Sequence, residues 1–487
     1  MAGDQGTRSL GAPAGVSVLR DLEGLVQVLT CGSVDDGKST LIGRLLWDAT
    51  DLPEDTRATI EKSIGTDGLP DLSLLVDGLV AEREQGITID IAWRYVDAGS
   101  RRYVIIDSPG HEQYTRNMAT GASHADVAIM LIDARHGVKR QTRRHAAILD
   151  LMGVRRVVLA VNKMDLVDWS EARFREIEAD FAGVMRRFGF EQAQAIPVAA
   201  KLGDCVACAS EHMTWYTGPT LLDVLAAVPS RGTKTGGPFR FPVQLVLRGK
   251  GSDFRGLAGT VASGRVAVGD EVRDSSSGKT AKVRRIATMD GHLDSAAIGQ
   301  AVVIQLDVDL DISRGSVLSQ PGAAPVTART LRSRMVWLAE TPLTQHQGML
   351  LRTATDLVPV SRLDIASRLD LETLAEEAVQ TAHPNDVIAA SITLARPVAV
   401  DRFAEIAETG SFILVDSLTG GTLAGGVVED AMAGAKTATK GAFLLTRQML
   451  AGGVCAGLDP AGAEFQRRAD EVATILRAAG VTVEIER

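Results

Sequence analysis

The chain has 487 residues, a formal net charge of −9 and an isoelectric point near 5.5. This acidic balance argues against nucleic acid as the main partner. The four cysteines form no disulfide framework, and no apolar run reaches the roughly 20 residues that span a bilayer. We therefore expect a cytoplasmic protein of about three domains, bound to neither a membrane nor a nucleic acid.

The chain begins with a segment that lacks the apolar core of a signal peptide, and we expect residues 1–19 to be flexible. Residues 20–232 then alternate strand-like apolar runs with helical stretches, the latter at Thr142–Met152 and Glu171–Phe188. This alternation predicts an α/β domain with a mostly parallel sheet and helices on both faces. The strand-like runs are LVQVLTC (25–31), RRYVIID (101–107), VAIMLID (127–133), RVVLAVN (156–162) and AIPVAA (195–200).

The pattern changes after residue 236. Short alternating runs separated by Gly, Asp and Ser turns predict a β-barrel domain over residues 237–325 and a second one over residues 326–429. The remaining residues, 430–487, have apolar side chains at helical spacing from Phe465 to Ala479. A strand-like VTVEI follows, so we expect a C-terminal αβ extension.

The stretch GSVDDGKST fits the P-loop pattern Gly-x-x-x-x-Gly-Lys-Ser, after a strand and before a helix. In such a loop the backbone N–H groups surround phosphates, Lys38 reaches the β- and γ-phosphate oxygens, and the Ser39 hydroxyl ligates Mg²⁺. A glycine-rich turn without a ligand is the alternative. The predicted phosphate-binding residues are Gly32, Ser33, Val34, Asp35, Asp36, Gly37, Lys38, Ser39 and Thr40.

A second motif, DSPGH, ends the strand-like run at 101–107. Asp107 can hold Mg²⁺ through water, and the N–H of Gly110 can sense a γ-phosphate. His111 is either a buried histidine bonded to backbone or the residue that orients the attacking water, and we favour the second role. Ser108 and Pro109 complete this part of the predicted nucleotide site.

A third motif, NKMD at Asn162–Asp165, follows the strand-like run at 156–162. The carboxylate of Asp165 can accept hydrogen bonds from guanine N1–H and the 2-amino group, a donor pair that adenine lacks. Lys163 and Met164 lie between, and Thr88 in GITID is placed to bring a hydroxyl to Mg²⁺. The motifs together predict a P-loop GTPase that uses GTP and Mg²⁺.

The aspartates Asp35 and Asp36 stand inside a loop that should bind an anion. We interpret Asp36 as a solvated or partner-facing charge. Asp35 matches the Asp of a VDxGK pattern, where it can bond loop amides and hold a monovalent cation beside the phosphates. The predicted catalytic residues are Lys38, Asp35, Gly110 and His111, and the predicted metal ligands are Ser39, Thr88 and Asp107.

Longer stretches resemble one family in particular. CGSVDDGKSTLIGRLL, IIDSPGHEQYTRNMATGASHADVAIMLIDARHGV and DFRGLAGTVASGRVAVGDEV are similar to the large subunit of bacterial sulfate adenylyltransferase, a GTPase of the translation-factor class. The resemblance implies that GTP hydrolysis here drives synthesis of adenosine 5′-phosphosulfate and pyrophosphate from ATP and sulfate. It also implies a small partner subunit, in a heterodimer or larger assembly, that carries out the adenylyl transfer.

The chain departs from the family at the base-binding loop, where a serine is replaced in AAKLGD by Ala199. The resemblance still places Ala199, Ala200 and Lys201 beside the base, with the N–H of Ala200 at guanine O6. Many relatives continue into an adenylylsulfate kinase, but no second P-loop motif occurs within residues 430–487. That segment is either a truncated kinase remnant or an unrelated extension, and we expect no kinase activity from it.

Two other functions stay open at this point. An elongation-factor-like translation GTPase would share the P-loop, DSPGH, NKMD and barrels, although RNA delivery favours a basic surface. A protein that binds GTP only as a switch would need no hydrolytic residues, yet Lys38, Ser39, Thr88, Asp107 and His111 are all present.

Overall fold

The computed structural model divides the chain into two compact units, 1–431 and 432–487, which are described separately. The N-terminal residues 1–19, expected to be flexible, lie outside the described part. The described residues are 25–50, 52–64, 68–76, 88, 90–98, 101–229, 236–249, 254–344, 347–432, 442–446, 450, 455, 457–459, 462–478 and 482–485.

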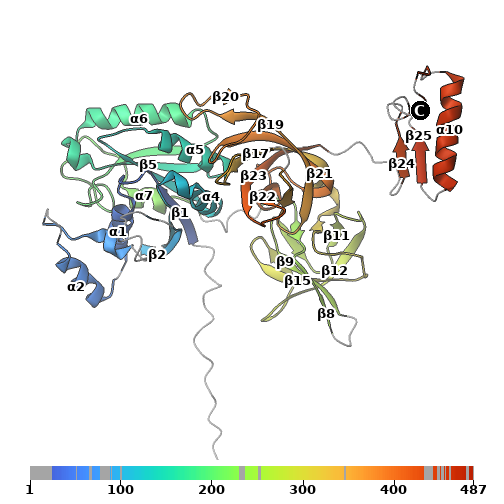
Figure 1. The fold of residues 1–487 in the computed structure, drawn as a ribbon. Coiled ribbons are helices and arrows are strands. Elements are labelled where there is room, and N and C mark those ends of the chain that lie inside the picture. Colours follow the sequence, from blue (N-terminus) through green and yellow to red (C-terminus); the bar gives the residue numbers. More distant parts are fainter. Residues whose placement is uncertain are drawn as a thin grey trace, which may run out of the picture. The chain divides into compact units, whose positions relative to one another are not determined.

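The first domain is built on a six-stranded sheet with the strand order β2-β3-β1-β4-β5-β6 (Figure 1). Strand β2 runs antiparallel to β3, and the other neighbouring pairs are parallel. The α/β fold class with a mostly parallel sheet is therefore confirmed. The strands are β1 (Leu25–Cys31), β2 (Ala92–Ala98), β3 (Arg101–Asp107), β4 (Val127–Asp133), β5 (Arg156–Asn162) and β6 (Gln192–Pro197).

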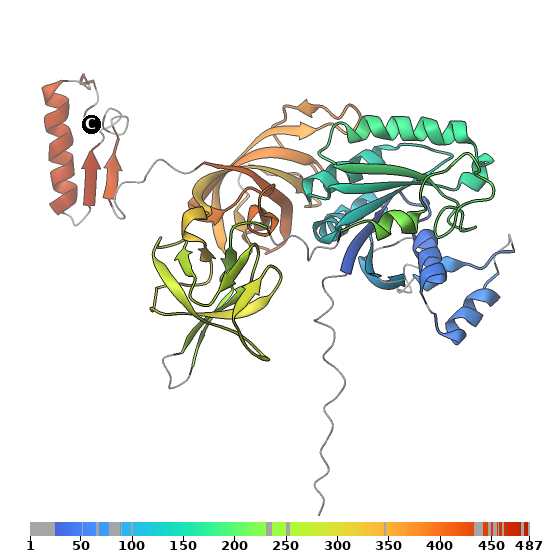
Figure 2. The ribbon, with the colours of Figure 1, turned by 180° about the vertical axis from the view of Figure 1, so that it is seen from behind.

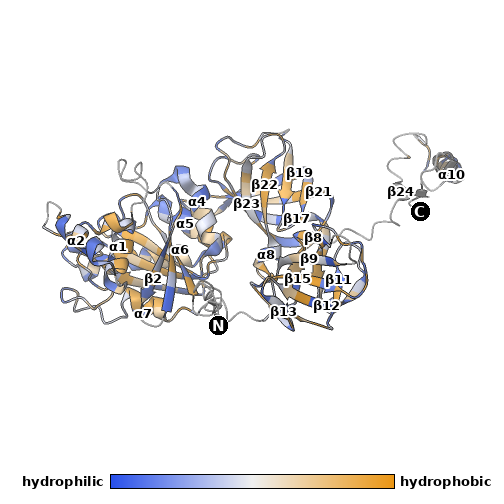
Figure 3. Cartoon of the chain, turned by 90° about the horizontal axis from the view of Figure 1, so that it is seen from below, coloured by the Kyte–Doolittle hydropathy of each residue, from blue (hydrophilic) through white to orange (hydrophobic). Residues whose placement is uncertain are grey.

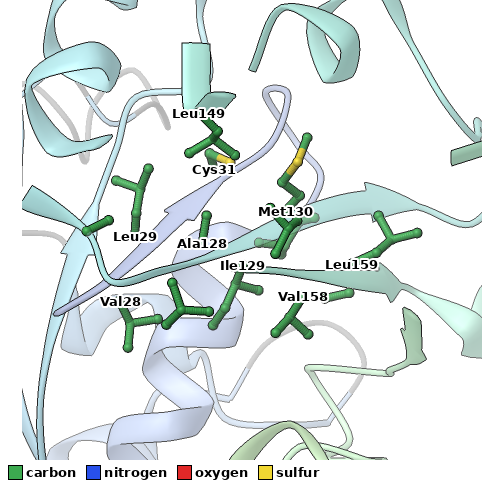
Figure 4. Packing of buried hydrophobic residues seen from close by; sticks show 14 of the residues in the cluster. Val28, Leu29, Cys31, Ala128, Ile129, Met130, Leu149, Val158 and Leu159 are labelled. Atoms are coloured by element: carbon green, nitrogen blue, oxygen red, sulfur yellow. The ribbon is translucent and has the colours of Figure 1, made fainter. Parts of the chain in front are cut away.

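Helices cover both faces of this sheet, because its central strands are apolar on both sides. Figure 4 shows Val28, Ile129 and Val158 on one side of the strands and Met130 and Leu159 on the other. The hydropathy colouring of Figure 3 shows the same concentration of apolar residues along the strands. One face carries α1 (Lys38–Ala49) and α7 (Leu221–Ala226), and the other carries α4 (Thr115–His124), α5 (Arg140–Leu151) and α6 (Glu171–Met185).

Two antiparallel barrels follow in the same unit, and Figure 2 shows them from behind. In the first, backbone hydrogen bonds of Arg240 with Ser263 and Ala262 join its first strand to the segment after β9. In the second, β18 pairs with both β22 and β19, which closes the ring. These are the barrel domains that the alternating pattern predicts. Strand β9 of the first barrel spans Arg255–Thr260. The strands of the second barrel include β17 (Val326–Trp337), β18 (Met349–Arg352), β19 (Leu357–Leu369), β21 (Val387–Val400), β22 (Ser411–Asp416) and β23 (Thr422–Met432).

The second unit contains a βαβ motif. Strands β24 (Ala442–Leu445) and β25 (Thr482–Ile485) are parallel neighbours, and α10 (Ala463–Ala478) lies between them in the chain. The buried side chains of Phe465, Ala469 and Ala473 form one face of α10. Ala479, the last residue of the expected helical pattern, lies outside the described residues.

A buried ion pair joins the two barrels. Nε and Nη2 of Arg240 each donate a hydrogen bond of 2.8 Å to one carboxylate oxygen of Asp401. The side chains of Arg240 and Asp401 are 3% and 6% exposed. The hydroxyl of Thr409 donates to the same carboxylate at 2.6 Å. The pair is therefore desolvated, and each charge depends on the other.

We expect Asp401→Ala to lower the free energy of unfolding by about 3–5 kcal/mol, because it leaves the Arg240 guanidinium buried and unpaired. The apolar double variant Arg240→Met/Asp401→Leu should recover most of that loss. Equilibrium urea unfolding, followed by tryptophan fluorescence and circular dichroism, measures both. A single variant as stable as the parent protein would contradict this interpretation.

Candidate nucleotide-binding site

The P-loop lies between the end of β1 and the start of α1, at the edge where the parallel strands end. Gly37 is the N-cap of α1 and has φ of +94°, a left-handed conformation that favours glycine. A Cβ at this residue would also collide with Nδ2 of Asn162, which follows β5. The two predicted loops are therefore in direct contact. The N–H groups at the start of α1 form an anion-binding helix terminus.

Lys38 folds back over the loop that precedes it. Its Nζ donates to the carbonyl oxygens of Gly32 at 3.0 Å and Ser33 at 2.9 Å, and the residue is 7% exposed. Burial lowers the pKa of Lys38, while the negative charges of Asp107 and Asp36 act to raise it. An ammonium has three donors, so one remains for a phosphate oxygen after these two bonds.

The structure corrects the interpretation of Asp36. Its side chain is 2% exposed, so it is not a solvated charge. One carboxylate oxygen accepts a hydrogen bond from the Ser33 N–H at 2.6 Å, and the other lies 3.5 Å from Nζ of Lys139. Asp36, and not Asp35, bonds the loop amide. Asp35 is exposed with φ of +67°, and its carbonyl accepts a hydrogen bond from Lys163.

The DSPGH loop lies against the P-loop because β3 is the direct neighbour of β1. Asp107 is 1% exposed and pairs in register with Thr30, whose carbonyl accepts a hydrogen bond from the Ser108 hydroxyl at 2.7 Å. A Cβ on Gly110 would lie only 2.5 Å from Lys38 Nζ. The first and second predicted motifs thus meet around Lys38, with Pro109 between Ser108 and Gly110.

His111 is partly exposed and not the buried histidine of the alternative interpretation. Its Nδ1 accepts a hydrogen bond from the backbone N–H of Gln113 at 3.3 Å, which caps the short helix η3 (Glu112–Tyr114). A neutral ring that accepts at Nδ1 carries its proton on Nε2. Nε2 can therefore donate a hydrogen bond.

The NKMD residues link the P-loop to the loop after β6. Nδ2 of Asn162 donates to the Asp36 carbonyl at 2.9 Å, and its Oδ1 accepts from the Ala200 N–H at 3.0 Å. Lys163 has φ of +63° and lies 3.1 Å from the Asp133 carboxylate. Met164 is fully buried beneath this turn. Asn162 is the residue that holds the three loops together.

Asp165 is half-buried, and its pKa is raised by burial and by the negative charge of Asp204. A carboxylate in such surroundings is stabilised by a ligand that donates hydrogen bonds. The Ala200 N–H, expected at guanine O6, already donates to Asn162. A guanine O6 would therefore have to share this donor, which the sequence pattern does not anticipate.

Two basic residues of the site are not evident from motifs. Arg44 on α1 donates to the carbonyls of Ala200 at 3.2 Å and Lys201 at 2.6 Å. Lys139, at the start of α5, pairs with Asp36. Both contacts join residues more than 100 positions apart, so only the fold could reveal them.

The remaining predicted residues lie around this centre. Ser39 and Thr40 are half-buried in the first turn of α1, next to Lys38. Thr88 is also half-buried, and the residues on both sides of it lie outside the described part. Of the four cysteines, Cys31, Cys205 and Cys455 are buried and Cys208 is exposed.

Ala199, at the position where the family resemblance implies a serine, is fully buried, and its N–H donates to the Asp204 carbonyl at 3.3 Å. The loop is therefore ordered without a serine hydroxyl. We expect Ala199→Ser to tighten GTP binding by less than about tenfold, since one typical hydrogen bond is worth roughly 0.5–1.5 kcal/mol. Fluorescent GTP titration measures this, and a thousandfold gain would show that Ala199 had cost the parent chain its base binding.

Comparison with known proteins finds family matches for the first domain and for the second barrel. Residues 23–230 match the elongation factor Tu GTP binding domain, and residues 330–429 match the GTP-eEF1A C-terminal domain-like family. Sulfate adenylyltransferase subunit 1 of Saccharophagus degradans is 46% identical over 84% of this chain and 87% of its own length. That of Teredinibacter turnerae is 45% identical over 86% and 90%.

The chain belongs to the sulfate adenylyltransferase subunit 1 family. Its first domain is an EF-Tu-like GTPase domain, which binds GTP. The bifunctional enzyme NodQ of Rhizobium sp. strain N33 is 48% identical over 84% of this chain, but the chain spans only 64% of the NodQ length. Within the described residues, every helix is too short or too polar to cross a bilayer.

Proposed function

We propose that this chain is the GTPase subunit of sulfate adenylyltransferase. It hydrolyses GTP while a partner subunit forms adenosine 5′-phosphosulfate and pyrophosphate from ATP and sulfate. The observation that carries the proposal is the junction of four loops at one sheet edge, made by Asn162 and by the close approach of Gly110 to Lys38. Family membership supplies the reaction to which that GTPase site is coupled.

The phosphates are bound by backbone N–H groups of the loop from Gly32 to Thr40, other than the Ser33 N–H that donates to Asp36, and by the third donor of Lys38. The Gly110 N–H meets the γ-phosphate. His111 acts through Nε2–H, because Nδ1 is taken by Gln113. It therefore orients the attacking water as a hydrogen-bond donor and is not a strong base in this arrangement.

Mg²⁺ would be held by the hydroxyls of Ser39 and Thr88 and by the carboxylate of Asp107. The residues fit a hard cation, because Ser39 and Thr88 supply hydroxyl oxygens and Asp107 supplies a buried carboxylate. When bound at these residues, Mg²⁺ would supply positive charge to offset the negative charge on the phosphates.

Guanine is bound by Asp165, whose carboxylate accepts from N1–H and the 2-amino group. The stem of Lys163 covers one face of the ring, and Ala199, Ala200 and Lys201 line the edge that carries O6. Met164 supports the turn from below. This set of acceptors selects guanine over adenine.

The proposal includes a monovalent cation bound by the carboxylate of Asp35. The carboxylate of Asp35 is exposed beside the phosphate loop, and within the described residues it accepts no hydrogen bond. A carboxylate next to phosphates is best tolerated with a cation between them. Asp35→Asn should remove the difference between K⁺ and Na⁺ in GTP hydrolysis, and an unchanged difference excludes this cation.

The partner is the small subunit, in a heterodimer or higher assembly, in the cytoplasm and without nucleic acid or membrane. A translation factor remains the second candidate, because the GTPase domain matches that of elongation factor Tu. Steady-state GTP hydrolysis by the purified chain separates them. Stimulation by the small subunit with ATP and sulfate supports our proposal, and stimulation by ribosomes supports the other.

The segment 430–487 is proposed to have no adenylylsulfate kinase activity, whether it is a kinase remnant or an unrelated extension. Its described βαβ unit has no second P-loop motif between β24 and α10. Incubation of the full chain with ATP and adenosine 5′-phosphosulfate tests this directly, since phosphorylation of the 3′-hydroxyl of the adenosine ribose would contradict it.

A further inference from the structure

A hydrogen-bonded cluster on α5 lies beneath the loop that carries His111. Nε2 of Gln141 donates to the Gly110 carbonyl at 3.3 Å and lies 2.9 Å from Nε2 of His145, one helical turn further on. Both contacts use the same amide nitrogen, which has two hydrogens to donate. The carbonyl that precedes His111 is therefore tied to α5 by Gln141.

The orientation of the Gln141 amide is determined by its other end. Its Oε1 accepts a hydrogen bond from Arg144 at 2.7 Å, so Nε2 must be the donor to His145. His145 therefore accepts at its Nε2 and is neutral. Burial lowers the pKa of His145 to about 3, with smaller contributions from the positive charges of Lys38 and Arg144. His145 therefore stays neutral and accepts the hydrogen bond from Gln141 throughout the physiological pH range.

The residue after His111 is held as well, from two directions. A carboxylate oxygen of Glu112 accepts a hydrogen bond from Arg144 at 2.9 Å. The backbone carbonyl of Glu112 accepts a local hydrogen bond from the Thr115 hydroxyl at 2.6 Å and a long-range one from Nδ2 of Asn385 at 3.1 Å, and Asn385 belongs to the second barrel. Asn385 has φ of +68°, and its own N–H donates to the Trp337 carbonyl at 2.8 Å, so its position is set by the barrel.

We propose that Gln141 and Asn385 are positioning residues for GTP hydrolysis. Gln141 ties the Gly110 carbonyl to α5, and Asn385 ties the Glu112 carbonyl to the second barrel. Helix and barrel together thereby set the direction of the His111 imidazole. The second barrel thereby contributes to the rate of hydrolysis through one side chain. This inference rests on the proposed role of His111 as the residue that orients water.

Asn385→Asp is the main test, because Asp tolerates a positive φ but its side chain has no N–H group to donate to the Glu112 carbonyl. Glu372→Gln is the matched control: Glu372 lies in the same barrel and pairs with Arg143 of α5 at 2.8 Å, but it does not touch the His111 loop. Gln141→Met, which keeps the length of the side chain, tests the other contact. Each is assayed in the full chain by single-turnover GTP hydrolysis and by fluorescent GTP titration.

We expect Asn385→Asp to slow hydrolysis by at least about fivefold and Gln141→Met by at least about tenfold, because small misplacements of a catalytic group have large effects on rate. The GTP dissociation constant should change by less than about twofold in both. Glu372→Gln should retain the parent rate. Equal slowing in the control, or an unchanged rate in Asn385→Asp, would overturn the inference.

The same substitutions in a His111→Ala background separate this inference from the proposed function. If Asn385 acts through His111, Asn385→Asp should change the rate of that background by less than about twofold, since effects through a shared residue are not additive. If Asn385→Asp instead slowed hydrolysis about fivefold in the His111→Ala background, as it should in the parent chain, Asn385 would have a general structural role. If His111→Ala itself hydrolyses GTP at the parent rate, the proposed role of His111 fails instead.

Discussion

Asp165→Asn is expected to weaken GTP binding at least about a hundredfold, because two hydrogen bonds to a charged acceptor are lost and each is worth roughly 1.5–3 kcal/mol. The Asn amide would turn a donor toward the donors of guanine. Xanthine has a carbonyl where guanine has the 2-amino group, so XTP should bind the variant better than GTP. Competition titrations with GTP, XTP and ATP measure this exchange of preference.

Asp168→Asn is the matched control for this experiment. Asp168 is an exposed aspartate three positions away, and its left-handed φ of +51° is one that Asn also adopts. It should leave both GTP and XTP affinities unchanged. If Asp165→Asn bound GTP as tightly as the parent chain, the base would have to be recognised elsewhere, and the assignment of the NKMD turn would be wrong.

Gly110→Ala is expected to slow GTP hydrolysis at least about a hundredfold, because the loop that bears His111 has no room for a side chain where it meets the P-loop. The new Cβ would lie 2.5 Å from Lys38 Nζ and 2.8 Å from the Gly32 carbonyl. The second contact is with backbone, so the Gly110 loop has to move away. Single-turnover hydrolysis at saturating GTP measures the effect.

GDP binding provides the internal comparison for Gly110→Ala, since GDP has no γ-phosphate for the Gly110 loop to contact. We expect the GDP dissociation constant to change by less than about tenfold while the hydrolysis rate falls far more. Gly322→Ala, at a site open to solvent, serves as a control and should behave as the parent chain. Parent-like hydrolysis in Gly110→Ala would show that the close contact with Lys38 has no part in catalysis.

Much of the first domain could be predicted because its signals are local. The strand-like runs at 25–31, 101–107, 127–133 and 156–162 coincide with the observed strands, since each is rich in apolar residues and bounded by polar residues or glycine. Strand β2 was missed because its exposed Trp93 and Tyr95 hide the alternation of an edge strand. β6 ends at Pro197, three residues earlier than expected, because Ala199 and Ala200 turn away to meet Asp204 and Asn162.

The site could be predicted only at the level of motifs. The order of the loops indicates which residues gather at one edge, but a motif does not show where a side chain points. Asp36 is an example, because its hydrogen bond from the Ser33 amide and its ion pair with the distant Lys139 cannot be inferred from GSVDDGKST. Asn385 is another, since it reaches Glu112 from a separate barrel.

Pyrophosphate release tests the central claim most directly. The chain is purified together with its small subunit and supplied with ATP and sulfate, with GTP present or absent. Our account predicts that GTP strongly stimulates release, that a non-hydrolysable GTP analogue does not sustain it, and that Asp165→Asn transfers the stimulation from GTP to XTP. Pyrophosphate release that proceeds equally well without GTP would contradict the proposal that GTP hydrolysis in this chain drives sulfate activation.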